Sequence, residues 1–524
     1  MRYDCHRMKL QPRRLALALP IGLAALVAAV WAPSLSGAFV WDDKNDIVRS
    51  DRIHDLGAVV EAFRHHAMWS ATAPETTVAT YRPIAIASLA IDYRLWGLWP
   101  VGYHVTSILL HVLATLAVML ALSRILGDKL AAAALALLFS LQPADAEAVA
   151  WINGRSEIFA LGFGALALWA AASRRWLILA PALLGAMLGK ETGAVFVPLS
   201  VAVAWIDAKG ERLQPSWPAP VAAVLGLAAY GVLRFHALGP STLPGSSLGA
   251  ALRSLPAVWM RATQEALLPL DRAPVTVSTW LESLPTWESA LYLGASLFLI
   301  AIGIVLVVKR RLVAVLGLAW WLGALVPLTA IAILDYPWPG LARWLYVGLP
   351  GLLLFVWKAA IERLGRRARL VTGALLGLAW LVASERAIPV WHDDTALYSA
   401  MIDAAPEDAW AWRALGSDQL AQGHFAEAAK LFEGATERDH TGEVHAAFGL
   451  EAFTWTFLGR CDEAVALYRD HPPTPAVEPN RFVDAAAACF ARAGDRDRAR
   501  QLWSLCARVR RSCVEALERL DREP

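Results

Sequence analysis

The chain has 524 residues, of which 57% are hydrophobic and 18% are charged, with a formal net charge of +2. That apolar share exceeds the roughly 45–50% of ordinary soluble domains and indicates an integral membrane protein. The near-neutral charge, together with the lack of a basic stripe interleaved with aromatic residues, argues against a nucleic-acid partner.

Apolar runs suited to crossing a bilayer recur up to residue 388. We expect about eleven membrane helices, over residues 15–36, 104–126, 130–150, 157–172, 176–189, 191–206, 219–237, 289–308, 312–334, 345–358 and 370–388. The first run could instead be a cleaved signal peptide, because small residues follow it in SLSGAF. Every second connection is rich in Lys and Arg, which predicts a cytoplasmic N-terminus and an external location for everything after residue 388.

The first predicted external loop, residues 37–103, contains the adjacent carboxylates Asp42 and Asp43 in the stretch FVWDDKNDIV. Taken alone, such a pair is more typical of a solvated loop or a helix N-cap than of a catalytic site. Later in the loop, residues 84–98 are apolar at helical spacing, with Asp92 and Arg94 on the polar side. This stretch is expected to rest in the membrane interface.

Charged and aromatic residues lie at the expected external ends of the later helices. They are Glu147, Trp151, Arg155, Lys190, Glu191 and Arg343. Glu147, Trp151 and Arg155 are spaced four apart and would share one face if their stretch is helical. Charges at membrane depth are costly and are usually paired or functional. Lys190 and Glu191 are therefore either substrate contacts or a pair that neutralises itself.

After residue 390 the apolar runs stop and an Ala-rich amphipathic helical pattern begins. Gly423, Gly459 and Gly494 recur at intervals close to the roughly 34 residues of a tetratricopeptide repeat. Each glycine is followed five positions later by an alanine: Ala428, Ala464 and Ala499. We expect three helix–turn–helix repeats here, and an arbitrary helical bundle is the alternative.

Four of the five cysteines fall in this C-terminal part: Cys461, Cys489, Cys506 and Cys513. An oxidising compartment would permit disulfides, whose connectivity the sequence leaves open. On one continuous helix, Cys506 and Cys513 would be two turns, about 10.5 Å, apart and could not bridge. Their spacing is not that of a metal site.

Six stretches occur in a fixed order along the chain. They are FVWDDKNDIV, YRPIAIASLAIDYRLWGLWPVGYHVTSILLH, QPADAEAVAWINGRSEIFAL, GKETGAVFVPL, PGLARWLYVGLPG and VWHDDTALYSAMIDAAP. This order resembles the transmembrane and tetratricopeptide-repeat proteins related to protein O-mannosyltransferases, a branch of the GT-C glycosyltransferases. Gln142–Pro143 replaces the usual His-Pro, and Ala342 stands where an acidic residue is common. Both departures put the identity of the donor in doubt.

The resemblance implies an all-α protein with two domains. Residues 1–390 would form a GT-C-like bundle of about eleven membrane helices, and residues 391–524 an external α-solenoid of tetratricopeptide repeats. The implied enzyme is an inverting hexosyltransferase that moves a hexose, with mannose expected, from a polyprenyl-phosphate donor to hydroxyl groups of exported proteins bound by the repeats. The expected location is a bacterial inner membrane with the repeats in the periplasm. The alternatives are transfer to a glycan or a lipid, and a non-catalytic membrane-anchored scaffold.

Such a displacement needs a base for the acceptor hydroxyl and cations for the leaving phosphate. By the resemblance, the base is Asp43 or Asp42, with Asp43 favoured, and the same pair could hold a divalent cation such as Mg²⁺ or Mn²⁺. No other cofactor is expected. The expected donor-binding residues are Arg343, Lys190, Arg155 and Arg82. The expected substrate contacts are Glu147, Trp151, Glu191 and His104.

Overall fold

The computed structural model describes residues 12–69, 80–206, 212–239, 248–269, 286–328, 342–439, 445–471 and 479–522. Within these ranges the regular structure is helical, apart from one isolated antiparallel bridge between Ile206 and Leu213. The chain divides into two compact units, Met1–Asp393 and Asp394–Pro524. The predicted all-α fold is confirmed.

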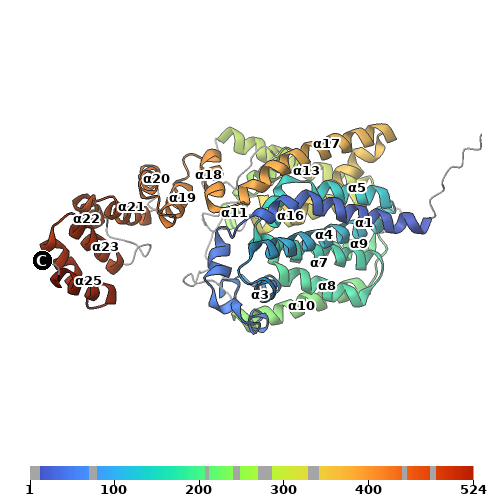
Figure 1. Ribbon diagram of the computed structural model, residues 1–524. Coiled ribbons are helices and arrows are strands. Elements are labelled where there is room, and N and C mark those ends of the chain that lie inside the picture. Colours follow the sequence, from blue (N-terminus) through green and yellow to red (C-terminus); the bar gives the residue numbers. More distant parts are fainter. Residues whose placement is uncertain are drawn as a thin grey trace, which may run out of the picture. The chain divides into compact units, whose positions relative to one another are not determined.

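The first unit is a bundle of apolar helices (Figure 1). Neighbours in a row are α1 (Pro12–Trp31), α4 (Pro100–Leu126), α7 (Arg155–Ala172), α8 (Trp176–Gly189) and α10 (Pro218–Leu238). The other long helices are α5 (Lys129–Ser140), α9 (Phe196–Trp205), α11 (Leu248–Leu267), α13 (Thr286–Val308), α14 (Leu312–Ala324), α16 (Ala342–Ala359) and α17 (Arg366–Ala387). α16 packs against α14, α7 and α5. A helix from the last third of this unit's sequence therefore contacts helices from its first half.

Seven helices of the described ranges are long and apolar enough to cross a bilayer, or eight if the bent pair Lys129–Ser140 and Pro143–Val149 is one span. Three shorter apolar helices also coincide with predicted runs: Trp176–Gly189, Glu191–Trp205 and Leu312–Leu328. The end of the predicted run 312–334 lies outside the described residues. The helices thus support a polytopic membrane protein, and the count of eleven spans stays a prediction.

The bent pair changes direction by 58° between Ser140 and Pro143. Proline has no N–H to donate and restricts the residue before it, so the helix cannot continue through Gln142. Gln142 adopts an extended backbone, and its side-chain oxygen accepts the N–H of Ala144. A new short helix, α6 (Ala146–Val149), then carries Glu147. The break therefore determines where this carboxylate lies.

The predicted interfacial stretch forms α3 (Pro83–Trp96). Leu95, Leu98 and Trp99, at and just beyond its end, are exposed, as an interfacial segment requires. The prediction that Asp92 occupies a polar outer side is wrong. Asp92 is 1% exposed and forms an ion pair with Arg155 at 2.6 Å, so a buried partner from α7 draws it into the bundle.

The second unit consists of helical hairpins. Its helices are α18 (Asp394–Ala404), α19 (Ala409–Ala421), α20 (Phe425–Arg438), α21 (His445–Phe457), α22 (Cys461–Asp470), α23 (Pro479–Arg492), α24 (Arg496–Cys506) and α25 (Arg511–Arg522). Gly423, Gly459 and Gly494 form the turns of three successive hairpins, each with a left-handed φ of 79–84° that favours glycine. The three predicted alanines are fully buried. The hairpins lie where the repeats were predicted, and their assignment as tetratricopeptide repeats stays a prediction.

Two disulfides join helices of the second unit. Cys461–Cys489 links α22 to α23, and Cys506–Cys513 links the end of α24 to α25. The expectation that Cys506 and Cys513 could not bridge assumed one continuous helix. It is wrong because α24 ends at Cys506 and α25 begins at Arg511, which leaves the two Cα atoms 5.9 Å apart.

Reducing these disulfides is expected to destabilise the second unit by about 2–4 kcal/mol per bond, because each bond restricts the unfolded chain. Cys461→Ser should destabilise the unit more than Cys506→Ser, since the Cys461–Cys489 bond closes 28 residues and the Cys506–Cys513 bond closes 7. Limited proteolysis of the full-length protein across a temperature series, with and without reductant, measures this. Cys5→Ser is the control, and equal protection of oxidised and reduced protein would contradict the expectation.

Candidate functional site

Segments far apart in the sequence meet at one end of the first unit. Four contacts join them: Ala38 N donates to His392 O at 2.8 Å, Asn153 N to Asp43 Oδ1 at 3.0 Å, Tyr81 N to Glu191 Oε1 at 2.7 Å, and Arg343 N to Glu147 Oε2 at 3.1 Å. All the segments involved are ones that the charge pattern placed on the external side. Residues separated by hundreds of positions therefore form one polar region.

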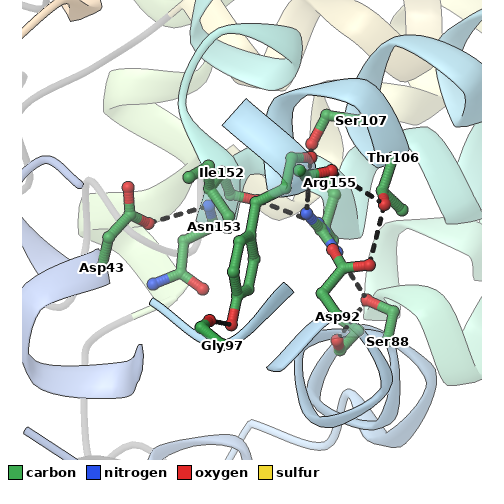
Figure 2. Close-up of polar contacts among 12 residues, drawn as sticks. Asp43, Ser88, Asp92, Gly97, Thr106, Ser107, Ile152, Asn153 and Arg155 are labelled. Carbon is green, nitrogen blue, oxygen red and sulfur yellow. Dashed lines mark hydrogen bonds and ion pairs between the residues drawn. The ribbon is translucent and has the colours of Figure 1, made fainter. Parts of the chain in front are cut away.

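Asp43 lies in the turn between Val40 and a short helical segment, Lys44–Val48, and its side chain is fully buried. Its two carboxylate oxygens accept the backbone N–H groups of Val40, at 3.1 Å, and Asn153, at 3.0 Å. Figure 2 shows the second of these bonds. Two donors from different segments hold the carboxyl group in one orientation.

The same turn concentrates negative charge. Burial raises the pKa of Asp43 well above its usual range, and the neighbouring carboxylates of Asp42 and Asp46 raise it further. Burial also raises the pKa of Asp46 to about 7, with Asp42 again adding to the effect. Asn153 donates its side-chain amide to Asp46 at 2.8 Å, which favours the charged form. The turn therefore holds one carboxyl group with a pKa of about 7, Asp46, beside a second, Asp43, whose pKa is raised well above its usual range.

Asp46→Asn is expected to raise the thermal stability of the protein at pH 8 and to leave it unchanged near pH 4. A carboxyl whose pKa is raised by folding contributes stability while protonated and loses it as pH rises through the folded-state value, here about 7. The uncharged asparagine side chain at position 46 does not titrate, so this loss of stability at high pH does not occur. Its amide oxygen can still accept the hydrogen bond from Asn153. Unfolding temperatures in detergent at both pH values test this, with the exposed Asp51→Asn as control. Equal shifts at both pH values would contradict it.

Arg343 lies in the first turn of α16 and is 5% exposed. Its backbone N–H donates to Glu147, and its Nε lies 3.5 Å from the other oxygen of the same carboxylate. Its guanidinium carbon lies 5.1 Å from the ring centroid of Trp151, within the range of a cation–π contact. Two predicted substrate contacts thus surround the predicted phosphate-binding arginine.

Lys190 and Glu191 do not neutralise each other, contrary to one of the two sequence-based interpretations. Lys190 is buried, forms an ion pair with Glu157, and places its ammonium 3.8 Å from the ring of Trp344. Glu191 instead accepts from the side chain of Arg82 at 3.1 Å. An extended backbone at Lys190 separates the two side chains, so each pairs with a residue of another segment, Glu157 in α7 and Arg82 just before α3.

Arg155 occupies a buried network instead of facing a substrate. Figure 2 shows its guanidinium between Asp92 and Ser107, and it also donates to the carbonyls of Ile152 and Tyr103. The predicted common face of Glu147, Trp151 and Arg155 is wrong. Trp151 has an extended backbone between two helical segments, so the stretch is not one helix. The geometry therefore favours a structural role for Arg155.

Two further predicted contacts are enclosed by protein. Trp151 is 4% exposed and stacks on Trp41 and Trp391, with ring centroids 5.1 and 5.6 Å away, so it offers little free ring to a sugar. His104 is 1% exposed, and its ring nitrogens have no hydrogen-bond partner among the described residues. A Cβ on Gly37 would come within 2.9 Å of that ring, so the first loop covers it closely.

The predicted cation site at Asp42 and Asp43 involves a carboxylate that already has two hydrogen-bond donors. Each oxygen of that carboxylate accepts one backbone N–H group, which leaves one lone pair per oxygen to face an ion. Among the described residues, one group of three possible ligands comes together, Asp484 with Cys506 and Cys513, and those two cysteines form a disulfide. A divalent cation at the site stays a prediction.

Asn153, Glu157 and Trp391 were missed as members of the site. Asn153 and Glu157 stand within the motif QPADAEAVAWINGRSEIFAL, so the motif itself was the available signal. Trp391 lies in VWHDDTALYSAMIDAAP, a stretch for which no chemical role was predicted. Their contacts depend on residues more than a hundred positions away, apart from the pairing of Glu157 with Lys190.

Comparisons with known proteins give relatives for about a quarter to a third of the chain. Protein O-mannosyl-transferase Tmtc1 of Drosophila melanogaster is 29% identical over 137 residues, which are 26% of this chain and 16% of that protein. Protein O-mannosyl-transferase TMTC1 of Mus musculus is 32% identical over 148 residues, 27% of this chain and 16% of the relative. The resemblance drawn from the six motifs is confirmed.

A protein O-mannosyl-transferase of Caenorhabditis elegans is 27% identical over 186 residues, 34% of this chain and 27% of that protein. The match thus spans between about a sixth and a quarter of the length of these relatives. No family model matches the chain.

Proposed function

We propose that the chain is a membrane glycosyltransferase that moves a hexose, with mannose expected, from a polyprenyl-phosphate donor to hydroxyl groups of proteins. One observation carries the proposal. The turn of Asp43 and the cations Arg343 and Lys190, which lie far apart in the sequence, belong to one polar end of the bundle. Trp151 links the two parts, because it contacts both Trp41 of that turn and Arg343. The printed names of the relatives support sugar transfer to protein.

In this mechanism Asp43 is the base that removes the proton of the acceptor hydroxyl. A base is most effective when its pKa lies near the working pH, and burial raises the pKa of Asp43 in that direction. Its two N–H donors fix the direction of its remaining lone pairs. The hydroxyl oxygen then attacks the anomeric carbon from the side opposite the phosphate, so the configuration inverts. Asp42, half-buried beside it, is the alternative base.

The leaving phosphate would be stabilised by Arg343 and Lys190. Arg343 presents a planar fork of donors, and Lys190 supplies a buried point charge. Each cation is paired with a carboxylate here, Glu147 and Glu157 respectively. Donor binding would replace part of these contacts with phosphate oxygens. Arg82, paired with Glu191 and about a quarter exposed at its side chain, would act at the edge of the site.

The proposed acceptor is an exported protein bound by the helical hairpins of the second unit. Stacked hairpins offer an extended surface of the kind that repeat proteins use for binding. The two disulfides support an oxidising compartment for this unit, since such bonds are rare in reducing ones. We therefore place the hairpins in the periplasm of a bacterial inner membrane, on the side where the donor would react.

The test uses the full-length protein in lipid nanodiscs with radiolabelled polyprenyl-phosphate mannose and a panel of exported polypeptides. Transfer to protein is expected, with label released by treatments that cleave sugars from Ser or Thr. Polyprenyl-phosphate glucose and GDP-mannose serve as alternative donors. If label reaches only lipid or glycan, the acceptor is a lipid or a glycan and the proposed protein acceptor is wrong. Absence of transfer from every donor, by folded protein, would overturn it in favour of a membrane-anchored scaffold.

A further inference from the structure

We propose that Trp391 is a positioning residue for the turn that carries Asp43, and that it acts through a stack of three indoles. The inference rests on the proposed function only for its effect on rate. No chemical role is predicted for Trp391 from the sequence, because it stands just beyond the last apolar run. In the structure it forms part of the short segment Ile388–Trp391, and it is 3% exposed.

The stack runs from one end of the first unit's sequence to the other. Trp391 stacks on Trp151 with ring centroids 5.6 Å apart, and Trp151 stacks on Trp41 at 5.1 Å, both pairs with rings inclined by 20°. Offset stacking at these separations is a favourable arrangement of aromatic rings. Trp41 directly precedes Asp42 and Asp43, so the stack ends at the carboxylate pair.

Trp41 has an unusual backbone that needs such support. Its φ of 55° lies in the left-handed region, which is disfavoured for a residue with a bulky side chain. Local bonds across the turn, from Asp43 N to Val40 O and from Lys44 N to Trp41 O, use this conformation. Strained conformations persist where the surroundings fix them, and they gather at functional sites. The stack on Trp151 supplies a fixed neighbour for this side chain.

A backbone bond reinforces the same connection. Ala38, three residues before Trp41, donates its N–H to the carbonyl of His392, the residue after Trp391. The segment that follows the last apolar run therefore contacts the first loop directly through the main chain, and it reaches Trp41 of that loop indirectly through Trp151. Arg343 also packs on Trp151, so the middle indole touches both the turn of the base and the proposed phosphate-binding cation.

The geometry thus assigns Trp391 the task of holding the Asp43 turn against the phosphate-binding side of the site. Removing its ring would leave Trp151 without one neighbour and would free Trp41 to leave its left-handed conformation. The carboxylate would then be displaced relative to the sugar. Small displacements of this kind reduce rates by roughly 10²-fold, because the reacting groups lose alignment.

The experiment compares Trp391→Ala, Trp391→Phe and Trp380→Ala in the full-length protein in nanodiscs. Trp380 is a matched control because it lies on α17, is 2% exposed and stands outside the stack. Hydrogen exchange of a peptide covering residues 38–48 reports the turn directly, without any need for activity. Near-ultraviolet circular dichroism follows the coupling of the stacked indoles. Transfer assays give kcat and the KM for the donor.

Trp391→Ala is expected to speed exchange of the 38–48 peptide by about 10-fold or more, weaken the indole signal, and lower kcat by roughly 10- to 100-fold with little change in KM. Trp391→Phe should keep the exchange rate and kcat close to their wild-type values. Trp380→Ala should leave the exchange at the wild-type rate. Unchanged exchange in Trp391→Ala, or equal acceleration in Trp380→Ala, would overturn the inference. If the wild type transfers no sugar, the proposed function fails, and the exchange data still decide the positioning role.

Discussion

Replacing Asp43 by asparagine is expected to lower the rate of sugar transfer by roughly 10²–10⁴-fold, the contribution of a positioned general base. The amide cannot accept the hydroxyl proton at any relevant pH. The acceptor site for one of its two N–H donors would also be lost, because an amide offers one oxygen where the carboxylate offers two. KM for the donor should change much less than kcat, since the base does not contact the phosphate.

Two variants separate this role from general damage to the turn. Asp51→Asn makes the same chemical change at an exposed position of the first loop and should leave the rate unaltered. Asp42→Asn removes a charge that raises the pKa of Asp43, so the acidic limb of the pH–rate profile should move to lower pH while activity persists. Loss of transfer in Asp42→Asn with full activity in Asp43→Asn would transfer the base role to Asp42.

Arg155→Met is expected to give the largest loss of stability, about 3–5 kcal/mol, because it leaves the Asp92 carboxylate buried without its charged partner. The guanidinium and the carboxylate lie at 2.6 Å, and both side chains are essentially inaccessible to water. Thr106 donates to the other oxygen of Asp92 at 2.7 Å, which alone cannot balance the buried charge.

The measurement is chemical or thermal unfolding in detergent, with Arg155→Met/Asp92→Leu as the matched double variant. The double change removes both charges and should recover part of the lost stability. Arg155 was predicted to bind the donor phosphate. If Arg155→Met kept wild-type stability and raised only the KM for the donor, the prediction from the sequence would stand and the structural role would be rejected.

The sequence predicts the positions of the helices well because hydrophobicity and turn residues act locally. The left-handed glycines at Gly423, Gly459 and Gly494 follow from constraints within a few residues. The same applies to the alanines buried between paired helices. These features need no knowledge of the rest of the fold. The prediction of one continuous span over residues 130–150, by contrast, is wrong, because the helix is broken at Pro143.

The pairing of buried charges could not be predicted in the same way. Lys190 stands next to Glu191 in the sequence but pairs with Glu157, and Asp92 was assigned to water although it meets Arg155 inside the bundle. The partner of a buried charge depends on which helices become neighbours in the fold. A buried charged side chain then pairs with an oppositely charged group that lies within ion-pair distance. Among the site residues, the sequence selected Asp43, Glu147 and Arg343 through their motifs, while the indole stack required the folded chain.

The hydrogen bond between Ala38 and His392 has a consequence for biogenesis. The first loop is synthesised early, but one of its fixed contacts is to a residue made more than 350 positions later. The turn of the carboxylates can therefore reach its final form only after the last apolar helix has been inserted. A chain arrested during translation before this point would hold the early helices with the Asp43 turn incomplete, so under the proposed function the order of synthesis would prevent transfer by the nascent protein.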